Sequence, residues 1–350
     1  MYMLRLSSPN KGFGLILPIS LAFVGAAAAF YEIFGESKDS QIYLQYFDYM
    51  ISKPSCFGEG IFNFEIGFET TSCFVSSILK SSTLVYSFFV FVSLLLKLIV
   101  LFLTLLNTKS SKLNIKLCSF LSVFLYFSRF FPLHELTQIR ASLSIAFILV
   151  GSLLLLQGSN LNKQVSKINP FALLMYFIAF LFHISSILIL PFLLISFYIK
   201  SRKDIIVYSI IIFIFIKLFF LQILVNFGVE LNPRLNEYVD APIYLQPVSL
   251  FSPRRGLDVF LIIIGLRNFN SQKRYYKFYL SVFTFSIISL YSLMDTPVFA
   301  HRLSEIMQVF GVLLVAVMRY KSQLIFTIPY VVIVSFLSIY AFFYTDEFFG

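Results

Sequence analysis

Long apolar stretches separated by short polar segments follow one another along the whole 350-residue chain. A helix needs about 20 mostly apolar residues to cross the hydrocarbon core of a bilayer, or somewhat fewer where other helices surround it. The pattern therefore predicts an all-α polytopic membrane protein with ten or eleven transmembrane helices. The expected spans are 13–34, 83–106, 114–131, 138–157, 170–183, 185–199, 205–227, 257–267, 275–294, 303–318 and 324–344.

Residues 1–350 contain no internal repeat, and we expect them to form a single transmembrane domain. The first apolar run follows Arg5 and Lys11 and ends in Ala26–Ala29, which is typical of a signal peptide. Because the run is about long enough to span a bilayer, we interpret it as an uncleaved first helix.

The segment 170–199 decides the orientation of everything after it, because it is either one tilted helix or two short helices that meet at His183. Cytoplasmic loops carry an excess of Lys and Arg. If the segment is split, all the basic clusters lie on the cytoplasmic side; without the split, the last three clusters move outside. The clusters are Arg5/Lys11, Lys109/Lys112/Lys116, Lys163/Lys167, Lys200/Arg202/Lys203, Arg267/Lys273/Arg274/Lys277 and Arg319/Lys321. We therefore predict a split, with both halves crossing or dipping in as a re-entrant hairpin.

This topology places the amino terminus in the cytoplasm and the carboxyl terminus outside. Two long outer loops are expected, at about 35–82 and at about 228–256. The second carries four prolines, and loops of that length are often functional. All three histidines, His134, His183 and His301, fall on the outer side.

Composition agrees with a membrane protein and narrows the functional classes. The chain is 59% hydrophobic and only 13% charged, with a mean hydropathy of +0.87, whereas soluble domains are about 25% charged. The net charge of +10 arises in short loops, so it predicts orientation and no nucleic-acid partner. The cysteines, Cys56, Cys73 and Cys118, lack zinc-ligand spacing and allow one disulfide at most, since only Cys56 and Cys73 share a compartment.

Ionisable side chains at the ends of membrane segments usually face a polar cavity or an opposite charge. The first such cluster runs from Arg129 through His134 and Glu135 to Arg140, which projects from the opening turns of a helix. The alternative interpretation is that Arg129 and Arg140 extend their long side chains to the membrane interface.

Two further clusters lie at predicted helix ends. His183 precedes two serines in an apolar run, and its alternative role is a hydrogen-bonded break between helices. His301 and Glu305 are one helical turn apart, beside Arg302, so an internal ion pair is the alternative there.

The chain contains no P-loop, GxGxxG, HExxH or Gly-x-Ser-x-Gly sequence. What remains is a set of outer arginines, carboxylates and histidines around a Phe-rich body. Arginine binds phosphate through paired, charge-assisted hydrogen bonds, and a histidine or carboxylate can accept a proton from a hydroxyl. A lipid-linked phosphate substrate would use both kinds of group, the arginines for its phosphate and the histidines or carboxylates for a hydroxyl proton.

Five elements in this order resemble the EpsG-like branch of the Wzy-type O-antigen polymerases. They are Asp39-x-x-x-Tyr43-x-x-Tyr46, Phe64-Glu65-Ile-Gly67-Phe68-Glu69, Ile139-Arg140-Ala-Ser-Leu-Ser-Ile-Ala146, Phe182-His183-Ile-Ser185-Ser186 and Ala300-His301-Arg302-Leu303. The chain departs from the family's usual pattern at Ile66, Ala141 and His301. Arg140, His183 and Arg302 are therefore the positions to which the family's roles transfer most directly.

The resemblance implies a nucleotide-independent membrane glycosyltransferase of GT-C-like architecture in the bacterial inner membrane, without cofactor or metal. It would transfer a growing glycan from undecaprenyl pyrophosphate to the next lipid-linked repeat unit at the periplasmic face, with a chain-length regulator as an expected partner. Arg140 and Arg302, with Arg254, Arg255 and His301, would bind pyrophosphate. The catalytic group that activates or orients the acceptor hydroxyl would be His183, Asp39 or Glu65.

Other classes of membrane protein remain alternatives. A flippase or transporter of lipid-linked sugars would place ionisable residues along a central pathway, where Lys97 and Lys217 are the main charges deep in predicted spans. A membrane O-acyltransferase or a glycan ligase would share the outer-face chemistry. The distribution of charges between outer face and midplane discriminates a polymerase from a transporter.

Overall fold

A computed structural model describes residues 12–31, 38–52, 64–107, 112–161, 169–220, 252–267, 269, 272–318 and 321–344. Every described secondary-structure element is helical. The chain divides into two compact units, which are described separately. Unit 1 comprises residues 1–109, 127–186 and 338–350, and unit 2 comprises residues 110–126 and 187–337.

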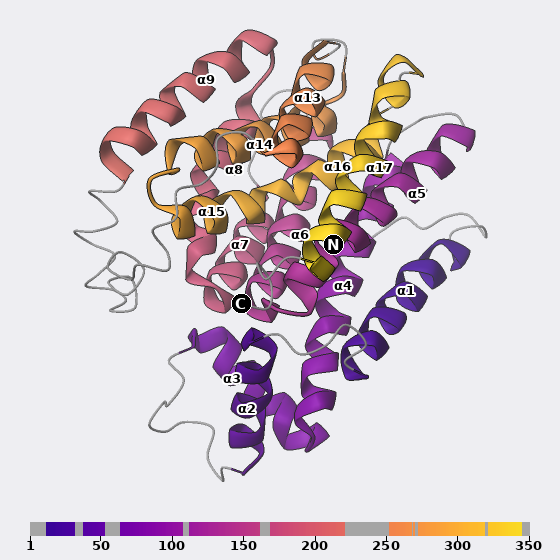
Figure 1. Ribbon diagram of the computed structural model, residues 1–350, viewed down its shortest axis with the longest axis vertical. Helices are drawn as coiled ribbons and strands as arrows, with labels where there is room; N and C mark the ends of the chain where they lie inside the picture. The colour runs from indigo at the N-terminus through magenta and orange to yellow at the C-terminus, as the bar shows by residue number, and fades with distance from the viewer. Residues whose placement is uncertain are drawn as a thin grey trace. The chain divides into compact units, whose positions relative to one another are not determined.

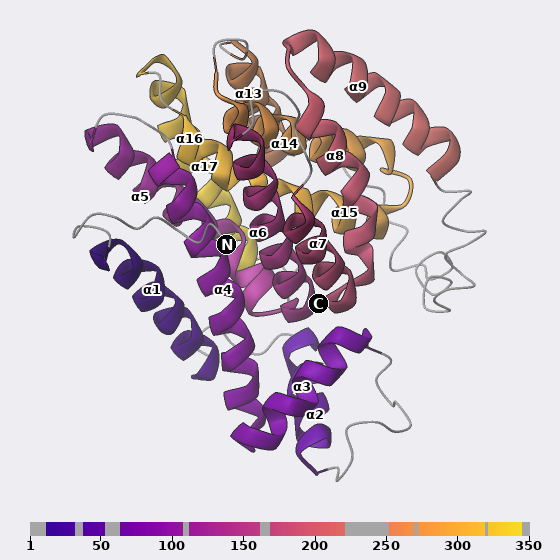
Figure 2. The same cartoon turned by 180° about the vertical axis from the view of Figure 1, so that it is seen from behind.

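Unit 1 is built around α4, which packs against α1, α2, α3 and α6 (Figures 1 and 2). The elements of this unit are α1 (Gly12–Phe30), α2 (Lys38–Ser52), α3 (Ile66–Leu79), α4 (Ser82–Asn107), η2 (Phe131–Glu135), α6 (Ile139–Leu161) and α7 (Pro170–Phe182). Helices α6 and α7 form a second close pair. Gly151 allows that approach, since a Cβ atom there would lie 2.8 Å from the Tyr176 ring.

Unit 2 is built around α14, which packs against α8, α9, α13, α15 and α16. The elements that lie wholly within it are α8 (Leu190–Tyr198), α9 (Arg202–Phe215), η4 (Ile216–Phe220), α13 (Pro253–Arg267), α14 (Arg274–Ser292), α15 (Pro297–Gln308) and α16 (Phe310–Val317). Three elements are shared between the units, namely α5 (Lys112–Arg129), η3 (Ile184–Ile189) and α17 (Lys321–Tyr344). Within unit 2 the Tyr330 hydroxyl donates to the buried Asp258 carboxylate at 2.8 Å.

Local sequence explains where several helices begin. The Ser201 hydroxyl and the Asp204 carboxylate form a capping box at the start of α9. The Asn169 side chain accepts a hydrogen bond from the Phe171 N–H at 3.0 Å, and Pro170 occupies the first turn of α7. These caps satisfy backbone N–H groups that have no partner inside their own helix.

The structure confirms the all-α polytopic membrane class. Among the described residues, four helical stretches are long and apolar enough to cross a bilayer, and four shorter apolar helices accompany them. The long ones are Ser82–Leu106, Ile139–Gln157, Phe299–Val317 and Ser322–Tyr344. Large apolar side chains such as Ile210 on α9 and Phe336 on α17 are more than half exposed, as expected for surfaces that face lipid.

Each of the eleven predicted spans overlaps a described helix. The predicted break at His183 is present: α7 ends at Phe182, and His183 has an extended backbone (φ −158°, ψ 112°). The segment 35–82, expected as a loop, contains the helices α2 and α3. Most of the second expected loop, at 228–256, lies outside the described residues.

Candidate functional site

Arg140 is the centre of a polar cluster in unit 1 (residues Tyr43, Glu65, Arg140 and His183). It is the second residue of α6, and its side chain is 19% exposed. Its Nη1 donates to the Glu65 carboxylate, and its Nε donates to the Tyr43 hydroxyl at 3.1 Å. The guanidinium carbon also lies 4.3 Å from the centre of the Phe64 ring, a cation–π contact. The guanidinium plane is therefore held in one orientation by three different side chains.

Glu65 connects the ends of three helices. It is the residue immediately before α3. One carboxylate oxygen binds Arg140 of α6, and the other lies 3.2 Å from the His183 Nδ1 at the end of α7. The same oxygen accepts the Ile184 N–H at 3.3 Å. Because an extended backbone at His183 ends α7, both the ring and the next N–H reach this carboxylate.

Close packing of α3 against the end of α7 makes these contacts achievable. A Cβ atom at Gly67 would lie 2.7 Å from the Leu181 carbonyl oxygen, a distance that side chains do not tolerate. Gly67 is two residues after Glu65, and Leu181 is two residues before His183. The absence of a side chain at Gly67 therefore sets the spacing between the carboxylate and the imidazole.

The electrostatics of the cluster favour an ionised carboxylate. Burial alone would raise the pKa of Glu65, but the hydrogen bond with His183 and the positive charge of Arg140 outweigh it. Together they lower the pKa of Glu65 from 4.5 to about 2. Glu65 thus carries a full negative charge at neutral pH and offsets the charge of Arg140. His183 is 12% exposed, and a hydrogen bond from its Nδ1–H to the carboxylate would fix the tautomer with the proton acceptor at Nε2.

Aromatic residues surround the cluster on the side of α2 and α3. Tyr43 is buried, and the centre of its ring lies 5.7 Å from that of Phe64 and 5.9 Å from that of Phe68. Tyr46 packs against Phe64 at 4.7 Å. Tyr43 and Phe64 belong to two of the five sequence elements that resemble the EpsG-like polymerases, but no role was predicted for them. Their contacts with Arg140 depend on α2 and α3 being helices, which the apolar pattern did not predict.

The structure places the other predicted site residues elsewhere. Asp39 lies in the first turn of α2, is exposed, and is not one of the partners of Arg140, Glu65 or His183 among the described contacts.

Arg254 and Arg255 lie in the first turn of α13, and His301 and Arg302 lie on α15, all in unit 2. His301 Nδ1 is 4.0 Å from Glu305 Oε1. That contact is the internal pair given as the alternative role of His301.

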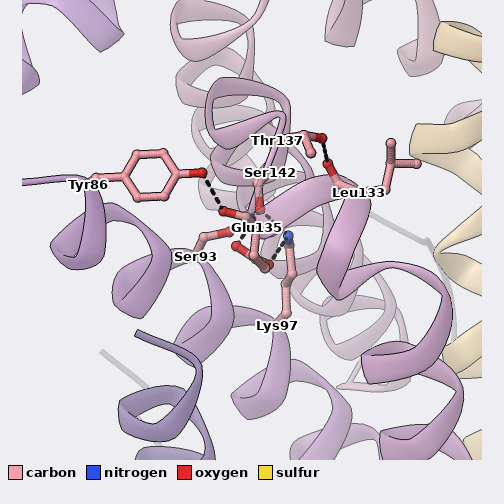
Figure 3. A network of polar contacts seen from close by, with 7 residues as sticks. All are labelled: Tyr86, Ser93, Lys97, Leu133, Glu135, Thr137 and Ser142. Carbon is pink, nitrogen blue, oxygen red and sulfur yellow. Dashed lines mark hydrogen bonds and ion pairs between the residues drawn. The ribbon is translucent and has the colours of Figure 1, made fainter. Parts of the chain in front are cut away.

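Figure 3 shows a second charged group in unit 1, the pair formed by Lys97 and Glu135. Lys97 of α4 donates to Glu135 of η2 at 2.7 Å, and their side chains are 2% and 0% exposed. Lys97 was predicted to be a charge deep in a span, but its pairing with Glu135 was not predicted. The signal was present, because a charge within an apolar helix requires an opposite charge or a polar partner nearby.

No group of three or more His, Cys, Asp or Glu residues suited to a metal ion occurs in the described part of the chain. Cys73 on α3 is disulfide-bonded and Cys118 is a buried free thiol, which agrees with the single disulfide that the sequence allows.

The fold and the cluster define an integral membrane protein of the all-α class with a charge-compensated arginine–carboxylate–histidine site at helix ends. The chain matches the model of the EpsG family over residues 15–349 and therefore belongs to that family. This is a family of Wzy-like polymerases, so membership supports a polymerase-like role in polysaccharide biosynthesis at a membrane. Comparison with curated proteins and with solved structures finds no match.

Proposed function

We propose that this protein is a polysaccharide polymerase that transfers a growing glycan from undecaprenyl pyrophosphate to the next lipid-linked repeat unit. The observation that supports it most directly is the contact of Arg140 and His183 with one carboxylate, Glu65, in a member of the EpsG family. The cluster combines a group suited to a phosphate leaving group with a group suited to accepting a proton.

Arg140 would bind the pyrophosphate of the donor. A guanidinium has five N–H donors, and the described contacts use two of them, one to Tyr43 and one to Glu65. The remaining N–H groups suit a phosphate oxygen. As the bond between the sugar and the pyrophosphate breaks, the leaving group gains its electron pair. A fixed positive charge with little solvent around it stabilises that charge without reorganisation.

His183 would act on the acceptor. The acceptor hydroxyl oxygen attacks the anomeric carbon of the donor sugar, and the hydroxyl proton passes to His183 Nε2. Glu65 orients the imidazole through Nδ1 and stabilises the imidazolium that forms. In this proposal His183 activates the acceptor hydroxyl without a nucleotide or a metal. Asp39, which is exposed on α2, is a less suitable base because no charged partner orients it among its described contacts.

The proposed site faces the periplasm of a bacterial inner membrane. The positive-inside pattern places α3 and the start of α6 on the outer side of the membrane. The disulfide at Cys73 on α3 supports the same assignment, because disulfides persist in oxidising compartments. Arg302, with Arg254, Arg255 and His301, stays a prediction for further pyrophosphate contacts, and a chain-length regulator stays an expected partner.

A glycan ladder tests the proposed function. The gene is deleted in its native background, and the surface polysaccharide is separated on a gel with and without wild-type, Arg140→Ala and Arg302→Ala copies. Loss of the ladder with retention of a single repeat unit on the core is the expected result for the deletion and for Arg140→Ala. Loss of even the single unit would indicate transport or ligation, and an intact ladder of altered mass would indicate an acyltransferase. A wild-type ladder from both arginine variants would contradict the mechanism.

A further inference from the structure

The buried pair of Lys97 and Glu135 joins three elements of unit 1 at one point (Figure 3). Lys97 Nζ on α4 lies 2.7 Å from Glu135 Oε1 on η2 and 2.6 Å from Ser142 Oγ on α6. Ser142 in turn donates to the other Glu135 oxygen at 2.7 Å, and Ser93 Oγ of α4 lies 2.7 Å from Ser142 Oγ. Each charged atom thus has a partner on a different segment.

Stability alone does not account for this pair. Transfer of two charges out of water is costly, and well-packed apolar side chains of similar volume often serve a fold as well or better. The more distinctive property of a buried ion pair is its directional geometry, since one lateral position of the helices satisfies all its hydrogen bonds. The pair therefore fixes the place of α6 relative to α4.

Two physical connections run from the pair to Arg140. The first is the α6 backbone, because Ser142 is two residues after Arg140 and projects about 200° around the helix from it. A rotation of α6 that moves Ser142 therefore moves Arg140 as well. The second runs through rings: the Tyr86 hydroxyl donates to the Glu135 carbonyl at 3.2 Å, and the Tyr86 ring lies 6.5 Å from the Tyr43 ring. Tyr43 is the residue that accepts from Arg140 Nε.

We infer that Lys97 and Glu135 are positioning residues, which hold the first turn of α6 so that the Arg140 guanidinium is aimed at the donor pyrophosphate. None of the residues in their described contacts is one that the proposal assigns to the substrate, so they would act through Arg140. The inference rests on the proposed function, since it takes Arg140 as the group that binds the pyrophosphate.

The first test replaces both charges at once. Lys97→Met with Glu135→Met removes both charges of the pair together, so the melting temperature in detergent should fall less than for either single replacement, which leaves the other charge buried. Turnover of a purified lipid-pyrophosphate-linked repeat unit should fall about tenfold or more in kcat/KM, because a small misplacement of a catalytic group is costly. The matched control is Tyr176→Phe, which removes a buried hydrogen bond between α7 and Ser152 of α6 and should leave kcat/KM unchanged.

A double-mutant cycle then separates positioning from a general structural role. The charge-pair replacement is repeated in an Arg140→Lys enzyme, which keeps the charge but loses the planar fork. If the pair acts through Arg140, its replacement costs little further activity in that background. An equal loss in both backgrounds, or full activity of the double-methionine variant, would overturn the inference.

Ser142→Ala provides the second variant should the double replacement fail to fold. It keeps both charges and removes only the hydroxyl that joins them to α6. A reduced kcat/KM that does not add to the effect of Arg140→Lys supports positioning, and unchanged activity overturns it. An unchanged ladder after the gene deletion would instead refute the proposed function itself, and wild-type activity of Arg140→Ala would refute the role of Arg140 on which the inference rests, so the failures are distinguishable.

Discussion

Glu65–Arg140 in unit 1 and Lys217–Asp295 in unit 2 are the same kind of contact, a carboxylate on a basic side chain, in two different environments. Glu65 and Arg140 are 18% and 19% exposed, and His183 and Tyr43 hold them further. Lys217 and Asp295 are 41% and 66% exposed. Exposed pairs contribute about 0–1 kcal/mol to stability, whereas partly buried charges with fixed partners can act on a substrate. Burial therefore favours Glu65–Arg140 over Lys217–Asp295 as the candidate site.

Among the substitutions in the two pairs, Glu65→Gln should have the largest effect on activity. The neutral amide of this variant would no longer offset the charge of Arg140, so the donor should bind more tightly and its KM should fall. His183 would lose the carboxylate that orients it, so kcat should fall about 10²-fold. Steady-state kinetics with the lipid-linked repeat unit measure both constants.

The control for this change is Asp48→Asn, which removes a charge from an exposed position on α2. It should leave both constants unchanged. A rise in donor KM for Glu65→Gln, with kcat preserved, would show that Glu65 binds substrate instead of orienting His183.

Gly67→Ala tests whether the spacing of α3 and α7 assembles the site. The new methyl group would meet the Leu181 carbonyl, and we expect a loss of about 1–3 kcal/mol in unfolding free energy together with reduced turnover. Gly256→Ala on α13 is the matched change, since nothing lies within 4 Å of its Cβ position. Without a clash, alanine in a helix is neutral or stabilising. We therefore expect the free energy of unfolding to fall in Gly67→Ala and to stay the same or rise in Gly256→Ala. Thermal unfolding of both variants measures these changes in stability.

Acid should weaken the Glu65 cluster only at low pH. The pKa of Glu65 in the folded protein is about 2, below its ordinary value of 4.5. The stabilisation from this lowered pKa is therefore complete above about pH 4.5 and lost as the pH falls towards 2. The difference in melting temperature between wild type and Glu65→Gln should not shrink from about pH 7 to 5 and should shrink below that range. A difference that already shrinks between about pH 7 and 5 would contradict the lowered pKa.

Asp295→Asn should have the smallest effect. Its pair with Lys217 is exposed to solvent and screened by salt, so the change in unfolding free energy should stay below about 1 kcal/mol. The length distribution of the polysaccharide should match wild type. A collapsed ladder would show that the exposed pair matters for function and that burial is a poor guide to the site.

The helical membrane class followed from sequence because its cause is local. Runs such as 83–106 and 324–344 must satisfy their own backbone in lipid, and only a helix does so within one segment. The break at His183 could be predicted because only a split segment puts all the basic clusters on the cytoplasmic side, and the positions of those clusters are read from the sequence. Arg140, His183 and Glu65 were recognised in motifs, but the apolar pattern gave no sign of α2 and α3, whose polar and aromatic residues lack long apolar runs.

The sequence by itself thus determined which segments are helices in the membrane and which ionisable residues are unusual there. Only the tertiary structure decided the partners: that Glu65 binds both Arg140 and His183, and that Lys97 is paired with Glu135. Hydrophobic periodicity is set by neighbours a few residues apart. The contact from Glu65 to His183 spans 118 positions and depends on how closely α3 packs against α7, which the bare backbone of Gly67 allows.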